Sequence, residues 1–119
     1  MTVRTKRVYE PAEDQDGFRV LVDRLWPRGV SKEAAHVDLW LRDVAPSTDL
    51  RRWFHHEERL FDEFAARYRA ELDAHGDAVA ELRDVVGQHP VVTLVYGARD
   101  EQHNQAVVLR DYLAASASS

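Results

Sequence analysis

Residues 23–29 read Asp-Arg-Leu-Trp-Pro-Arg-Gly and combine residue types that suit the binding of an anion. The side chains of Arg24 and Arg28 offer forked N–H donors that match a carboxylate or a phosphate. The proline keeps Trp26 out of helical geometry, and Gly29 permits a positive φ angle and a close approach of the backbone to a ligand. We therefore expect a shaped loop in which these four residues contact a ligand.

Residues 97–104 read Gly-Ala-Arg-Asp-Glu-Gln-His-Asn and carry a second group of polar side chains. Arg99 adds a further cation, and His103 is a candidate general acid or base that Asp100 would orient. Asn104 would then position a substrate or donate to developing negative charge. The alternative is structural, because Asp100 is a good helix N-cap and the neighbouring polar residues suit a first helical turn.

Two aromatic residues near these segments have two interpretations each. Trp26 either forms a pocket wall or packs in the core, and Tyr96 either points its hydroxyl toward a ligand or is a core residue. A metal site is a weaker hypothesis, in which Asp100 and His103 are joined by His55 or His56. No two histidines have the i, i+4 spacing of a helical zinc pair, so the sequence predicts no metal and identifies no cofactor.

The elements that must position both segments alternate between strands and helices. We expect strands over residues 5–9, 18–22 and 91–96, and helices over residues 31–35, 46–54, 57–75 and 77–86, with a last helix after residue 104. This alternation predicts an α/β domain with a small, mostly parallel sheet covered by helices. Ligands of such sheets bind beyond the carboxyl ends of the strands, where residues 23–29 and 97–104 would share one cleft.

Size and composition set further limits. A chain of 119 residues fits a single domain over residues 1–113, followed by a flexible tail at 114–119. The net charge of −5 makes nucleic-acid binding an unfavoured function. Cysteine is absent, which excludes disulfides and thiol catalysis. The sequence begins without a secretory signal and has no apolar run long enough for a membrane span, so we expect a cytoplasmic protein without a membrane partner.

The ordered motifs resemble those of the YeaO-like family, also called domain of unknown function 488. The resemblance rests on residues 23–29, on Ala-Pro-Ser at 45–47 with the Trp-Phe pair at 53–54, and on the ending from Tyr96 to Asn104. It covers roughly residues 6–113 and implies a small bacterial cytosolic domain whose biochemical role is not established.

Three functions remain open from the sequence. The favoured one is the binding or processing of a small anionic ligand in the shared cleft, with Arg24 and Arg28 holding the anion and His103 moving a proton. The second is a non-catalytic interaction or regulatory module that recognises a protein or nucleic acid through Arg24, Trp26 and Arg28. The third is that both loops only stabilise the fold.

Overall fold

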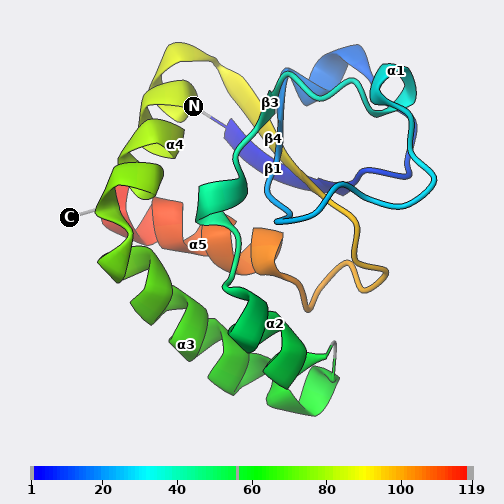
Figure 1. Ribbon diagram of the computed structural model, residues 1–119. Coiled ribbons are helices and arrows are strands. Elements are labelled where there is room, and N and C mark those ends of the chain that lie inside the picture. The colour runs from blue at the N-terminus through cyan, green and yellow to red at the C-terminus, as the bar shows by residue number, and fades with distance from the viewer. Residues whose placement is uncertain (1, 56, 118–119) are drawn as a thin grey trace.

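A four-stranded parallel sheet organises the chain in a computed structural model that describes residues 2–55 and 57–117 (Figure 1). The strand order is β1-β4-β2-β3, and all three strand pairs are parallel. The strands are β1 (Thr2–Arg7), β2 (Phe18–Leu21), β3 (Leu39–Trp40) and β4 (Val91–Tyr96). The expected α/β class with a parallel sheet is confirmed.

The central strand β4 follows from the uninterrupted apolar run in its sequence. It pairs with β1 on one side and with β2 on the other, and Leu94 lies opposite both Thr5 and Val20. Both faces of β4 are also covered, because Leu94 packs in one apolar cluster and Val95 in the other. A strand buried on both faces does not alternate between apolar and polar residues. The predicted range 91–96 is confirmed at both ends.

Over residues 2–55 and 57–117, five α-helices connect and cover the strands. They are α1 (Lys32–Ala35), α2 (Thr48–Phe54), α3 (Phe61–Ala74), α4 (Gly76–Gln88) and α5 (Gln105–Ala117). The first two begin within the expected ranges 31–35 and 46–54 and have serine N-caps, because the Ser31 and Ser47 side chains accept from Ala34 N and Leu50 N at 3.1 Å each. A short 3₁₀ turn, Glu58–Leu60, precedes α3 and takes the first part of the predicted 57–75 helix.

The alternation of side chains along β2 separates two apolar clusters. Val20 and Val22 point into the main core, which α2 to α5 form with the sheet, whereas Leu21 points into a smaller cluster with Val8, Ala35 and Val95. Trp26 and Trp40 pack against the smaller cluster. In Figure 1, α1 and its flanking loops accordingly lie on the other side of the sheet from α3 and α4.

Several boundaries differ from the prediction for local reasons. β1 occupies Thr2–Arg7 instead of residues 5–9, because its register is set by pairing with β4. α4 begins at Gly76, one residue before the expected start, and ends at Gln88, two residues after the expected end. α5 continues through 114–117, where a flexible tail was expected; alanine, the strongest helix former, is frequent there. His56 and residues 118–119 lie outside the described residues.

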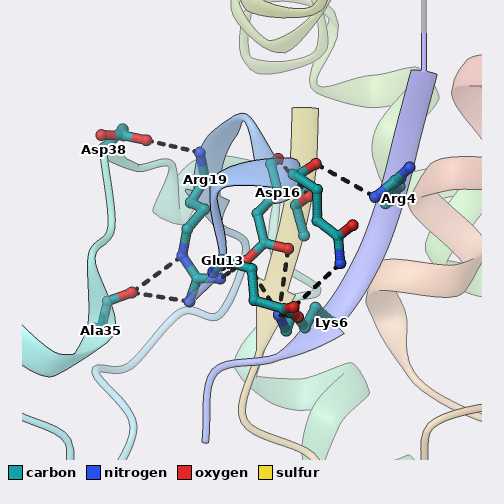
Figure 2. A network of polar contacts seen from close by, with 9 residues as sticks. Arg4, Lys6, Glu13, Asp16, Arg19, Ala35 and Asp38 are labelled. Carbon is teal, nitrogen blue, oxygen red and sulfur yellow. Dashed lines mark hydrogen bonds and ion pairs between the residues drawn. The ribbon is translucent and has the colours of Figure 1, made fainter. Parts of the chain in front are cut away.

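A buried ion-pair network holds the segment before β2 in place (Figure 2). The Arg19 guanidinium donates to Asp16 Oδ2 at 2.7 Å and to the Ala35 carbonyl oxygen at 2.9 and 3.2 Å. Lys6 Nζ reaches both oxygens of the same carboxylate at 3.2 Å. Because these groups satisfy one another, we assign the network a role in folding and not in ligand binding.

None of the helices described over residues 2–55 and 57–117 is long and apolar enough to cross a bilayer.

Candidate functional site

The two polar segments begin side by side, because β2 and β4 are parallel neighbours and end at the same edge of the sheet. The Asp23 carboxylate accepts from Gly97 N at 2.8 Å through Oδ2 and from the Gln105 side chain through Oδ1. A Cβ atom at position 97 would lie 2.9 Å from Asp23 Oδ2, so a larger residue there would displace the carboxylate. Asp23 therefore joins the two loops at the carboxyl edge of the sheet.

A cavity of about 460 Å³ opens beside this contact. Its walls come from the loop after β2, from Gly97 and Ala98, and from the end of α2, with Phe54 and Phe64 contributing apolar surface. The volume falls in the range of small-molecule sites, which are concave and mostly apolar with a few placed polar groups. This cavity lies at the carboxyl ends of the strands, where we expected a ligand, and from residues 97–104 it is lined by Gly97 and Ala98.

The charged groups lining the cavity are predominantly cationic. Arg24, Arg28, Arg51 and Arg52 contribute four guanidinium groups, against the single carboxylate of Asp23. Within residues 2–55 and 57–117, no hydrogen bond or ion pair holds the guanidinium of Arg28, Arg51 or Arg52, although Arg51 acts on Asp23 electrostatically at longer range. Three arginine side chains are therefore available to a ligand.

Burial changes the acid–base behaviour of Asp23. Loss of solvent raises the pKa of this carboxyl from 3.8 to about 6, against the opposing effects of the Gly97 N–H, Arg51 and Gln105. Near neutral pH the group sits close to its titration range. When it is protonated, the cavity loses its negative charge and Arg51 is released from an internal counter-charge.

The Arg24 side chain differs from the other three. Its Nε donates to the Pro46 carbonyl oxygen at 3.1 Å, and its Nη2 donates to the Ala45 carbonyl oxygen at 3.2 Å. The sequence predicted a ligand contact, whereas these bonds tie the loop after β2 to the start of α2. Arg24 borders the cavity but its donors are largely engaged.

We expect Arg24→Ala to lower the free energy of unfolding by about 1–3 kcal/mol, because two half-buried carbonyl groups lose charged donors. Urea unfolding followed by tryptophan fluorescence measures the change. The matched variant Arg28→Ala removes an exposed arginine of the same loop and should change stability by less than about 0.5 kcal/mol. Equal losses in both variants would contradict the structural role of Arg24.

The rest of the loop is shaped mainly by internal contacts. Trp26 lines the cavity, but its indole N–H donates to the Val30 carbonyl oxygen at 2.7 Å and its ring meets Trp40 edge-on at 5.5 Å. Gly29 has φ of 74° and lies exposed, which fits a tight turn. The Arg28 carbonyl oxygen accepts from the Tyr9 hydroxyl at 2.9 Å, which leaves the Arg28 side chain unaffected.

The second segment separates into buried residues and exposed ones. Tyr96 is buried in the main core, and burial raises the pKa of its hydroxyl. Asn104 is buried and caps α5, because its Oδ1 accepts from Val107 N at 3.1 Å. The cap expected at Asp100 is therefore at Asn104, and Asp100 instead accepts from the N–H groups of Gln102 and His103 at 2.9 Å each.

Neither proposed catalytic residue lines the cavity. His103 lines a separate hollow with Glu58, and its ring bonds to Asp100, while Arg99 is exposed and lies outside the cavity lining. The residues that the sequence reasoning missed are Arg51 and Arg52 at the end of α2. The two adjacent arginines before Trp53 could have indicated this, because an amphipathic helix that buries its apolar face turns its charged residues away from the core.

Comparison with known proteins decides the family. The model of the inactive DUF488-N3 subclade matches residues 2–119. The chain belongs to this subclade. The chain is 44% identical over 113 residues to the uncharacterized protein YeaO of Escherichia coli K12, covering 95% of this chain and 97% of the relative. The expected YeaO-like membership in DUF488 is confirmed.

A further relative is the uncharacterized protein Rv3073c of Mycobacterium tuberculosis H37Rv. It is 49% identical over 111 residues, which cover 93% of this chain and 92% of the relative. No solved structure matches the chain significantly. The DUF488 relatives give the bacterial setting and no reaction, so the site has to be interpreted from its own chemistry.

Proposed function

We propose that this DUF488 domain binds a small anion, without catalysis, in the cavity between the loop after β2 and the end of α2. The observation that carries the proposal is the set of three guanidinium groups, on Arg28, Arg51 and Arg52, that face one cavity without internal hydrogen bonds among the described residues. Guanidinium groups bind carboxylates and phosphates through paired N–H donors. A bound anion would supply hydrogen-bond acceptors for the N–H donors of these three arginines.

Two observations favour binding over turnover. The candidate acid–base pair, Asp100 and His103, lies outside the cavity lining, whereas the exposed His55, for which no role in proton transfer was expected, does line it. The matching family model is itself described as inactive. Asp23 is held by Gly97 and Gln105, which suits a positioning role. The cytoplasmic location expected from the sequence stays a prediction.

A protein-recognition role is the second candidate, because two large apolar side chains at the cavity mouth are exposed. Leu25 is 64% exposed and Tyr9 is 46% exposed, and both line the cavity. A partner that presents a carboxylate or phosphate beside an apolar group would use the same arginines. This version shares the anion site and adds contacts around it.

Calorimetric titration with sulfate at low ionic strength tests the proposal, since salt screens such a charged site. We expect one binding site with a dissociation constant near about 1 mM, and a loss of affinity of about tenfold or more in Arg51→Gln and in Arg28→Gln. The matched control is Arg99→Gln, which removes an exposed arginine outside the cavity.

Circular dichroism establishes that each variant is folded. Equal weakening by Arg99→Gln and Arg51→Gln would show that sulfate responds only to overall charge, which contradicts a defined site. Absence of any sulfate binding at low salt would contradict the proposal directly.

A further inference from the structure

A second group of polar side chains lies away from the arginine cavity. Glu58 comes from the 3₁₀ turn before α3, whereas Asp100 and His103 come from the loop between β4 and α5. One potential ligand atom from each of the three residues lies within 4.8 Å of the other two. The fold therefore brings an imidazole and two carboxylates together from segments that are distant in the sequence.

Asp100 fixes the orientation of the imidazole. Its Oδ1 accepts from the N–H groups of Gln102 and His103, and its Oδ2 contacts His103 Nδ1 at 2.9 Å. A carboxylate that accepts two backbone N–H groups acts as an acceptor toward the ring as well. Nδ1 must then carry the hydrogen, and in a neutral ring Nε2 presents a lone pair.

The second ring nitrogen faces another acceptor. His103 Nε2 lies 3.6 Å from Glu58 Oε1, which is too long for a hydrogen bond. Ligand atoms around a tetrahedral ion with bonds of about 2.0–2.2 Å are separated by about 3.3–3.6 Å. The separation of the two acceptors therefore matches that of two ligands of one cation. The Phe61 ring packs edge-on against the imidazole, with ring centroids 5.0 Å apart, and supports its orientation.

We propose that His103 Nε2 and the Glu58 carboxylate bind a divalent cation of the zinc type, with Asp100 orienting the histidine. A carboxylate that accepts the other ring N–H of a ligating histidine is the usual arrangement behind such metals. Asp62 lines the same hollow, four residues beyond Glu58, and adds negative charge there. His103 is 27% exposed, so the ion has access from solvent and water completes its coordination.

The mixed ligand set selects the class of ion. Imidazole suits zinc and its neighbours in the first transition row, whereas magnesium and calcium prefer oxygen ligands alone. The site is independent of the arginine cavity, because Glu58, Asp100 and His103 do not line that cavity. Zinc binding and sulfate binding therefore fail or succeed separately.

Titration with Zn²⁺, and with Co²⁺ as a visible-light probe, tests the site in the full chain. We expect one equivalent to bind, an absorption band from bound Co²⁺, and an affinity loss of about tenfold or more in Glu58→Gln, His103→Gln and Asp100→Asn. The control His36→Asn removes another exposed histidine, and asparagine tolerates its φ of 48°. It should bind zinc as the parent protein does.

A measurement on the unaltered chain guards against misfolded variants. Added Co²⁺ should broaden or shift the amide signals of Glu58, Gln102 and His103 before others in ¹H–¹⁵N spectra. Failure to bind Zn²⁺ at 1:1 stoichiometry, or binding that survives His103→Gln and Glu58→Gln, overturns the proposal. The same holds if the first perturbed signals lie around other histidines.

Discussion

Replacing Arg19 with methionine should lower the free energy of unfolding by about 3–5 kcal/mol, because it leaves a buried carboxylate without its closest partner. Arg19 is 3% exposed and Asp16 is 4% exposed. The substitution removes the 2.7 Å contact to Asp16 Oδ2 and both donors to the Ala35 carbonyl oxygen. Lys6, which lies beside Asp16 in Figure 2, would then remain as a cationic partner of the Asp16 carboxylate.

Urea unfolding measures this loss, with Arg4→Met as the control. Arg4 belongs to the same region but is exposed, and its guanidinium donates to the Gln15 carbonyl oxygen at 3.3 Å. Its replacement should cost less than about 0.5 kcal/mol. Combining Arg19→Met with Asp16→Asn should cost less than the sum of the single changes, because the two residues share one interaction. A cost for Arg19→Met below about 1 kcal/mol would contradict the network's role in folding.

As the pH rises, the free energy of unfolding of Asp23→Asn should increase relative to that of the parent protein. The Asp23 carboxyl has a pKa of about 6 in the folded state, against an ordinary value of 3.8 that applies when the chain is unfolded. Between these two values the folded state holds a proton that the unfolded state has released, so this group's contribution to stability falls with increasing pH. The full loss across the interval is about 3 kcal/mol.

The stability difference between the parent protein and Asp23→Asn isolates this contribution, since other carboxylates titrate in both proteins. Asp16 and Asp100, whose pKa values lie below normal, act in the opposite direction and cancel in the difference. We expect the difference to change by about 2 kcal/mol from pH 4 to pH 7, in favour of the variant, because part of the full loss already occurs below pH 4. The control is Glu33→Gln, which removes an exposed carboxylate from α1. If the stability difference from the parent protein is independent of pH for both variants, the burial of Asp23 is contradicted.

Much of the fold is predictable because the strongest sequence signals are local. The run over 91–96 has only one role in a small α/β domain, and Ser47 begins α2 through a cap that the neighbouring residues alone define. The position of the cavity followed from a general rule of parallel sheets. The rule gives the edge of the sheet but not the side chains that reach it.

The composition of the site depended on tertiary packing. Arg24 looked like a ligand contact until α2 brought the carbonyl groups of Ala45 and Pro46 within reach. Arg51 entered the cavity for the same reason, because the direction of its helix relative to the sheet is set by the core and not by local sequence. The N-cap of α5 could have been Asp100 or Asn104, and only the path of the loop selects Asn104.

A crystal of the protein soaked in tungstate and measured at the tungsten absorption edge tests the central claim most directly, because the heavy tetrahedral anion reports its own position. The account predicts one strong anomalous peak in the cavity after β2, within hydrogen-bond distance of Arg51 and Arg28 and lost in Arg51→Gln crystals. An empty cavity with anions bound only at other surface cations would contradict it.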